Sequence, residues 1–215
     1  MADAAVVAVP PVVRPGAPAV AQALGTGAVV GLPAVGGYCL AVRAGTPGAE
    51  DRVEALARQP TGGIGRAADD WPRYLVADAE GVGALADEGG DELMALLARC
   101  WPGPLEVAVR RDGVLITVGQ PDGRALRRLC RDCGPWRAAS LGPAAASDVA
   151  AAYRAVDVAC VVDGGARGGA PATVVDVTVT PLCVVRQGAL PASYIEAAML
   201  MGNRRRWFGG RRKHP

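Results

Sequence analysis

The chain has 215 residues, of which 51% are hydrophobic, 4% aromatic and 20% charged, and its formal net charge is +2. Lysine, histidine and phenylalanine each occur once, as Lys213, His214 and Phe208, so residues 1–203 contain none of the three. Because residues 1–203 have no histidine, they cannot form a histidine-dependent metal site or a Ser/His/Asp or Cys/His nucleophilic site. Because they have no lysine, they cannot carry out Schiff-base chemistry or provide the lysine of a P-loop.

The charge is distributed unevenly along the chain. No acidic residue follows Glu196, while six of the 23 basic residues lie after Asn203. The rest of the chain holds 17 basic residues against 21 acidic ones, so the body carries about −4 and the tail +6. An acidic body is a poor platform for nucleic acid, whereas a basic tail suits one.

The length favours one domain with short tails. We expect a flexible Pro-rich lead at residues 1–18, a single domain at 19–202 and a basic tail at 203–215. No apolar run reaches the ~18 residues of a transmembrane span, and the lead lacks the basic start of a signal peptide. The six cysteines are mostly scattered singly, as in a protein with reduced thiols, so we expect a cytoplasmic location.

Apolar periodicity predicts an alternation of helices and strands along the chain. In chain order we expect helix 17–24, strands 28–32 and 38–42, helix 50–58, loop 61–70, strand 74–77, helices 80–87 and 91–100, strands 105–109 and 114–118, helix 123–131, strand 137–140, helix 146–155, strands 158–162, 173–179 and 182–185, and helix 191–201. The Asp112-Gly113 pair predicts a tight hairpin. Hairpins and helical crossovers together indicate an α/β (α+β) fold with a mixed sheet and flanking helices.

Short motifs follow one another in a recognisable order. They are PAVGGYCL (33–40), ARQP (57–60), PRYLVADAEGVGAL (72–85), WPGPLE (101–106), TVGQP (117–121), GPWRAASLG (134–142), VVDGG (161–165), ATVVD (172–176) and RQG (186–188). In this order and spacing, from about residue 19 to 191, the chain resembles the YrdC-like family of threonylcarbamoyl-AMP synthases.

The resemblance implies a twisted mixed sheet with a concave binding face, in enzymes that combine L-threonine, bicarbonate and ATP into threonylcarbamoyl-AMP for tRNA modification. By the same resemblance, Ser140 and Arg186 would bind the nucleotide, and Tyr38 and Thr173 would bind the threonine substrate.

The chemistry-bearing positions of the family motifs are largely replaced. The Thr, Asp and Thr of PTDTVYGL are Ala34, Val35 and Gly36 here, and the Lys and Arg of KGRP fall at Ala57 and Gln59. The Arg of GVRVP, the Asn of SAN, the Ser of STVVD and the Thr of WPGPLT fall at Gly119, Gly142, Ala172 and Glu106. Adenylyl transfer needs positive charge against a triphosphate, and hydrogen bonds to charged groups contribute about 1.5–3 kcal/mol each. We therefore expect a weakly active or non-catalytic derivative that binds a nucleotide or RNA, and we assign no catalytic residue.

Two alternatives stay open. The first is an active L-threonylcarbamoyladenylate synthase in which Arg58, Arg66 or Arg186 binds phosphates; it would use ATP with Mg²⁺, whereas an inactive protein would need no cofactor. The second is a structural protein docked on tRNA or ribosomal RNA through its tail. Its RNA contacts would be Arg204, Arg205, Arg206, Trp207, Arg211, Arg212 and Lys213. The tail also suits an anionic membrane surface, or a solvated segment without a partner.

Three further patterns have ordinary structural explanations. Cys130 and Cys133 form a C-x-x-C without a second pair, which favours two small residues on a helix face over a zinc site. The glycine-rich segment 164–169 suits a connector more than an anion cradle. Asp69 and Asp70 suit a solvated loop, so no metal site is expected.

Overall fold

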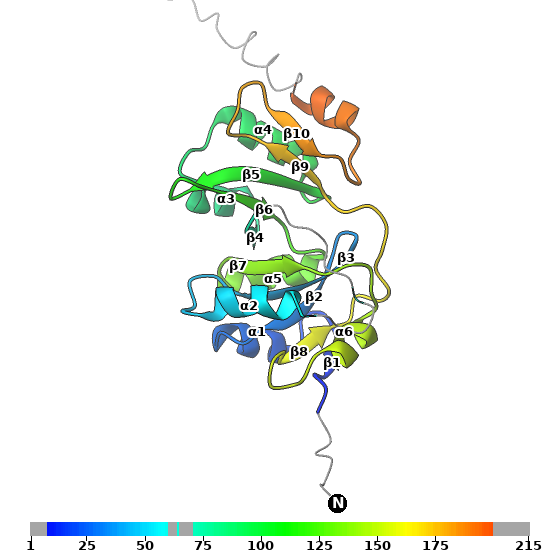
Figure 1. Ribbon diagram of the computed structural model, residues 1–215. Helices are drawn as coiled ribbons and strands as arrows, with labels where there is room; N and C mark the ends of the chain where they lie inside the picture. The colour runs from blue at the N-terminus through cyan, green and yellow to red at the C-terminus, as the bar shows by residue number, and fades with distance from the viewer. Residues whose placement is uncertain (1–7, 60–63, 65–70, 200–215) are drawn as a thin grey trace, which may run out of the picture.

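A computed structural model describes residues 8–59, 64 and 71–199 of the chain. In these residues one ten-stranded sheet runs through the molecule in the order β1-β8-β2-β3-β7-β4-β6-β5-β9-β10 (Figure 1). The strands are β1 (Val12–Val13), β2 (Val30–Ala34), β3 (Gly37–Arg43), β4 (Arg73–Leu75), β5 (Leu105–Arg111), β6 (Val114–Gly119), β7 (Trp136–Ser140), β8 (Cys160–Val162), β9 (Thr173–Asp176) and β10 (Cys183–Arg186). The helices are α1 (Pro18–Gly25), α2 (Ala49–Ala57), α3 (Ala79–Leu85), α4 (Asp91–Cys100), α5 (Arg124–Cys133) and α6 (Ala146–Ala152), followed by a helical stretch at 192–199.

The sheet is mixed, as the sequence predicts. β2–β3, β5–β6 and β9–β10 pair antiparallel, whereas β2–β8, β4–β6 and β5–β9 pair parallel. The predicted hairpin turn joins β5 to β6, with positive φ at both Asp112 and Gly113, the backbone that a two-residue type I′ turn requires. The Asp87 carboxylate accepts hydrogen bonds from both turn N–H groups, at 2.7 and 2.9 Å.

Alternating side chains place the helices on the two faces of the sheet. On β7, Trp136 and Ala138 pack into the cluster with α1 and α5, while Ala139 packs into the opposite cluster with α2 and α6. A third cluster joins α3, α4 and the 192–199 helix to Tyr74 and Val107. The residues just before Tyr74 and Val107, which are Arg73 and Glu106, therefore lie on the face of the sheet turned away from α3 and α4.

Several segments are shorter than the sequence-based expectation, such as α6, which ends at Ala152 and not at residue 155. Two of the differences have a clear physical reason. Val12–Val13, expected in a flexible lead, forms β1 and pairs parallel with β8, because the backbone of β8 offers an open edge for it. The strand expected at 173–179 ends at Asp176, whose carboxylate accepts from the Thr178 N–H and hydroxyl in a local turn.

Two other expectations concern parts of the chain that the structure does not describe. The loop at 61–70, apart from Ile64, and the basic tail at 203–215 both lie outside the described residues. Among the helices that the structure describes, none has the length and apolar character to cross a membrane.

Candidate active site

A cavity of about 150 Å³ brings together three of the four residues that the resemblance singled out within the domain. Tyr38, Ser140 and Arg186 line it, together with Arg73 and Glu106. The same wall also contains positions at which this chain has a small or apolar residue in place of a polar residue of the family motifs. They are Ala34, Val35, Gly36, Gly142 and Ala172. The motifs of the sequence therefore converge on one place, but its wall is poorer in polar groups than the family pattern.

A buried ion-pair triad dominates the electrostatics of this cavity. Glu106 Oε1 lies 2.5 Å from Arg73 Nη2, and Glu106 Oε2 lies 3.5 Å from Arg186 Nη2. The side chains of Arg73 and Glu106 are only 7% and 4% exposed, while that of Arg186 is 26% exposed. Charges as deeply buried as those of Arg73 and Glu106 persist only when they are paired, so Glu106 and Arg73 stabilise each other, while Arg186 approaches the same carboxylate from the more exposed side.

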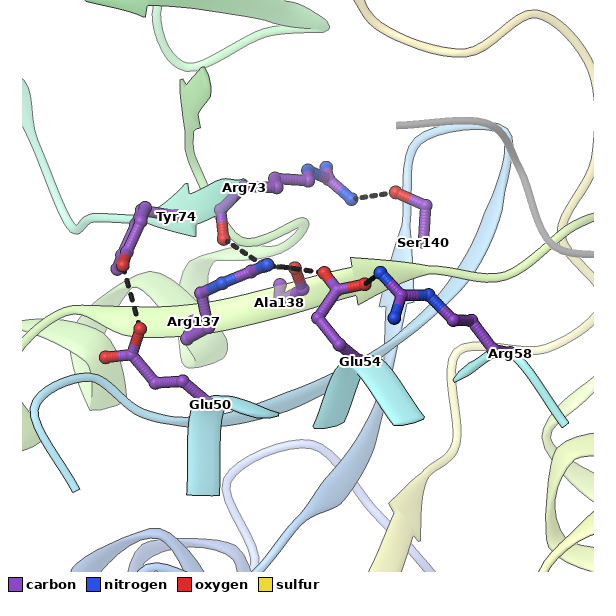
Figure 2. Close-up of polar contacts among 8 residues, drawn as sticks. All are labelled: Glu50, Glu54, Arg58, Arg73, Tyr74, Arg137, Ala138 and Ser140. Atoms are coloured by element: carbon purple, nitrogen blue, oxygen red, sulfur yellow. Dashed lines mark hydrogen bonds and ion pairs between the residues drawn. The ribbon is translucent and has the colours of Figure 1, made fainter. Parts of the chain in front are cut away.

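Arg73 also reaches the next strand of the sheet. Its Nη1 donates to the Ser140 hydroxyl at 3.0 Å, and Figure 2 shows the Arg73 side chain extended along the sheet toward Ser140. Arg73 therefore bridges the acidic group on β5 and the serine on β7. The sequence-based prediction missed Arg73, although a charged residue inside a short apolar strand is a signal that a buried partner exists.

Glu106 on β5 and Gly119 on β6 lie against each other. A Cβ atom built on Gly119 would lie 2.8 Å from Glu106 Cγ, closer than real side chains approach. The Glu106 side chain thus fills the space beside β6 in which a larger residue 119 would begin. By the resemblance, Gly119 stands where the GVRVP motif of the family has arginine. In this chain the negatively charged Glu106 side chain therefore lies beside a position that carries a positive charge in the family motif.

Tyr38 fixes the loop that follows β8. Its hydroxyl donates to the Gly165 carbonyl at 3.0 Å and accepts from the Gly164 N–H at 2.9 Å. Burial raises the pKa of Tyr38 above its ordinary value, against the opposing effect of the Gly164 N–H. The Gly165 N–H is bonded to Asp163 Oδ1 at 2.9 Å, so both glycine amides serve the loop itself, which favours the connector interpretation.

Thr173 is fully buried beside the cavity and is not part of its lining. Its hydroxyl donates to the Leu190 carbonyl at 2.7 Å and accepts from the N–H groups of Gly188 and Leu190 at 3.0 Å. A Cβ on Gly188 would lie 2.3 Å from the Pro171 carbonyl oxygen, so this turn needs glycine. In this arrangement Thr173 positions the backbone beside Arg186.

Arg58, a candidate for the role of the family lysine, points elsewhere. It pairs with Glu54 at 3.6 Å, its side chain is 63% exposed, and it does not line the cavity. Figure 2 shows Glu54 between Arg58 and Arg137, in a network on the α2 side of the sheet that continues with the Tyr74–Glu50 hydrogen bond of 2.8 Å. Arg66, the other candidate, lies outside the described residues.

The residues around the cavity do not fit a bound Mg²⁺ ion. In the described part of its lining the one carboxylate is Glu106, which two guanidinium groups already hold. Across residues 8–59, 64 and 71–199, no group of three or more His, Cys, Asp or Glu residues could hold a metal. Cys130 and Cys133 are free thiols on α5, and burial raises the pKa of Cys130 to about 12.

The mixed ten-stranded sheet, with the motif residues gathered in one cavity, is the arrangement that the family resemblance implies. Comparison with known proteins identifies the same family. The family model Sua5_yciO_yrdC, described as Telomere recombination, matches residues 22–188, and the chain belongs to this family. The curated threonylcarbamoyl-AMP synthase of Pyrococcus abyssi (strain GE5 / Orsay) is 29% identical over 149 residues, which cover 61% of this chain and 44% of that protein. The chain thus spans less than half the length of this relative.

Two solved structures resemble the fold closely. Sua5 of P. abyssi complexed with L-threonine has a TM-score of 0.68 at 25% identity, covering 83% of this chain and 56% of that one. YciO of E. coli has a TM-score of 0.65 at 16% identity, covering 85% of this chain and 95% of that one. The YciO likeness concerns the fold alone.

Proposed function

We propose that this chain is a weakly active or non-catalytic derivative of the threonylcarbamoyl-AMP synthases that has kept a reduced nucleotide-binding pocket. The observation that carries the proposal is the Glu106 carboxylate bound to both Arg73 and Arg186. In this arrangement two of the cations that could hold a triphosphate already share a buried anion. A phosphate group entering the cavity would have to displace Glu106 or lie beside its negative charge.

Size and charge support the same proposal. The cavity holds about 150 Å³, whereas small-molecule sites usually span about 300–1,000 Å³. Its described charged residues are two arginines and one glutamate, which leaves a net charge of +1. Stabilising a departing pyrophosphate needs several preorganised positive groups, so slow or absent adenylyl transfer is the expected consequence.

A second candidate, an active synthase, is favoured by the meeting of Tyr38, Ser140 and Arg186 in one cavity. The P. abyssi relative was solved with L-threonine, and by likeness the Tyr38 side would take that amino acid here. This candidate needs ATP with Mg²⁺, and the carboxylate for the ion would have to come from beyond the described lining. Either function would connect the chain to tRNA modification. Docking on RNA through the tail remains a proposal about residues outside those described.

Calorimetric titration with ATP and with L-threonine, paired with a pyrophosphate-release assay, tests the proposal. We expect no turnover above the uncatalysed background and weak ATP binding by the unaltered chain. Glu106→Thr, which carries the residue of the family motif, should bind ATP more tightly because the competing carboxylate is gone. The P. abyssi synthase serves as the positive control for turnover.

The same titration and pyrophosphate-release assay distinguish the weakly active or non-catalytic derivative from the active synthase. Robust pyrophosphate release by the unaltered chain with threonine, bicarbonate and ATP would contradict the derivative and establish the synthase. Arg186→Ala should then abolish that release, because it removes a cation from the cavity wall.

A further inference from the structure

A second and larger cavity lies at the carboxyl ends of the parallel strands β4 and β6, between α4 and α5. Its volume is about 740 Å³, within the range of about 300–1,000 Å³ typical of small-molecule sites. It shares no lining residue with the cavity around Glu106. The two cavities therefore have independent chemistry.

One wall of this cavity is a row of arginines on α5. Arg124, Arg127, Arg128 and Arg131 are spaced i, i+3, i+4 and i+7, which places them on one face of the helix. The buried residues of α5, Leu126 and Cys130, pack into the core on its other side. We call these four arginines the arginine wall.

The arginine wall carries positive charge that the protein does not neutralise. Arg131 pairs with Asp78 at 3.2 Å, and the lining contains one further carboxylate, Asp132. Among the described residues, Arg124 and Arg128 make no ion pair within 4 Å, and both are exposed. Four guanidinium groups against two carboxylates leave a surplus of two positive charges facing the cavity. Fork-shaped, permanently charged guanidinium groups bind phosphate and carboxylate oxygens in pairs, so a phosphate group fits this wall.

The opposite wall is apolar and rigid. Met94 and Leu97 of α4 contribute to it, and Met94 is 42% exposed. Trp101, directly after α4, also lines the cavity, and its Nε1 donates to the Leu105 carbonyl at 2.9 Å, which fixes the indole ring. An indole ring on such a wall is a surface on which a planar base can stack.

Gln120 also lines the cavity. Its Nε2 donates to the Ala77 carbonyl at 2.8 Å, which fixes the side chain. Its Oε1 is shielded from solvent and has no hydrogen-bond partner among the described residues. Gln120 therefore contributes a fixed part of the wall.

We propose that this cavity binds a nucleotide unit, with its phosphate on the arginine wall and its base against Trp101 and Met94. Phosphate alone would leave the apolar wall without a role, and an apolar ligand would leave the arginines without one. A free mononucleotide and one residue of a single-stranded RNA present the same chemistry. The proposal goes beyond the function proposed above, since it uses none of the residues around Glu106.

The test uses the full chain with two probes: AMP, followed by calorimetry, and a fluorescein-labelled single-stranded oligoadenylate, followed by anisotropy. The test variant is the double substitution Arg124→Glu with Arg128→Glu. Its control, Arg14→Glu with Arg154→Glu, makes the same change in net charge at exposed arginines outside the cavity. Circular dichroism verifies that each variant is folded.

We expect the test variant to weaken binding of at least one probe tenfold or more, while the control stays within a factor of three. Binding of AMP identifies a free nucleotide as the ligand, and binding of the oligoadenylate alone identifies RNA. The proposal is overturned if neither probe binds, or if both variants weaken binding equally. It is also overturned if Arg186→Ala removes the binding instead, because the nucleotide would then occupy the cavity around Glu106.

Discussion

Replacing Glu106 with glutamine removes the charge at the centre of the triad while keeping the shape of the side chain. Arg73 would then be a guanidinium group with 7% of its side chain exposed and no carboxylate at 2.5 Å. Removing one partner of a buried ion pair destabilises proteins by about 3–5 kcal/mol. Because Arg186 is 26% exposed and water can solvate it, we expect the lower end of that range, about 3 kcal/mol.

Urea unfolding followed by tryptophan fluorescence measures this loss. The matched control is Asp157→Asn, which removes the partner of Arg52 in an exposed pair of 3.7 Å with side chains 49% and 33% exposed. Exposed pairs of this kind contribute about 0–1 kcal/mol. A loss in Glu106→Gln no larger than in this control would refute the reasoning.

A second readout separates electrostatics from packing. In Glu106→Gln, Arg73 and Arg186 no longer share a carboxylate, so added pyrophosphate should bind the folded state and raise its stability. The comparison is made in chains that also carry Arg124→Glu with Arg128→Glu, which removes the arginine wall as a second anion site. In this background the chain that keeps Glu106 should gain much less, since Glu106 competes for the same cations. Equal stabilisation of both proteins by pyrophosphate would show that Glu106 does not occupy the anion site.

The other predictions concern single side chains. Tyr38→Phe should destabilise the fold by about 1–3 kcal/mol in urea unfolding, because the Gly164 N–H loses its acceptor; an unchanged midpoint would contradict this. Burial raises the pKa of Cys130 to about 12, so alkylation of the native protein at pH 8 should label the exposed Cys183 and spare Cys130 until the chain is denatured; mass spectrometry reads out the order. Two backbone N–H groups of the β5–β6 turn lower the pKa of Asp87. The Asp87 carboxylate should therefore stabilise the fold above the ordinary carboxyl pKa, and this stabilisation should be lost as the pH falls through the lowered pKa. An NMR titration that gives Asp87 an ordinary or raised pKa would count against this role of the turn.

Most of the fold could be predicted from the sequence, because apolar periodicity and turn residues are local signals. The predicted helix 91–100 is α4, and the Asp112-Gly113 hairpin joins β5 to β6 as expected. β1 could not be predicted, since Val12 and Val13 form a strand only by pairing with β8, a segment that lies far away in the sequence.

The candidate site could be predicted from the motifs only in part. Tyr38, Ser140 and Arg186, which the motifs single out, line one cavity, and their roles in binding a nucleotide and threonine stay predictions. Glu106 was visible as a departure from the family motif, but its pairing with Arg73 depends on the β4–β6–β5 order of the sheet, which no local pattern encodes. Thr173 shows the opposite case: it matches a family motif, yet its hydroxyl is used by the turn at 188–190.

The contact between Glu106 and Gly119 limits which pairs of residues these two positions can hold. With Glu106 in place, even the first side-chain atom of a new arginine at 119 would meet its Cγ at 2.8 Å. A smaller residue at 106 would have to come first, and that step leaves Arg73 without its buried carboxylate. Either change alone is therefore unfavourable, and a synthase-like pocket engineered into this chain would need both substitutions together. The three positions 73, 106 and 119 thus form one coupled unit of sequence, in which the choice at each depends on the other two.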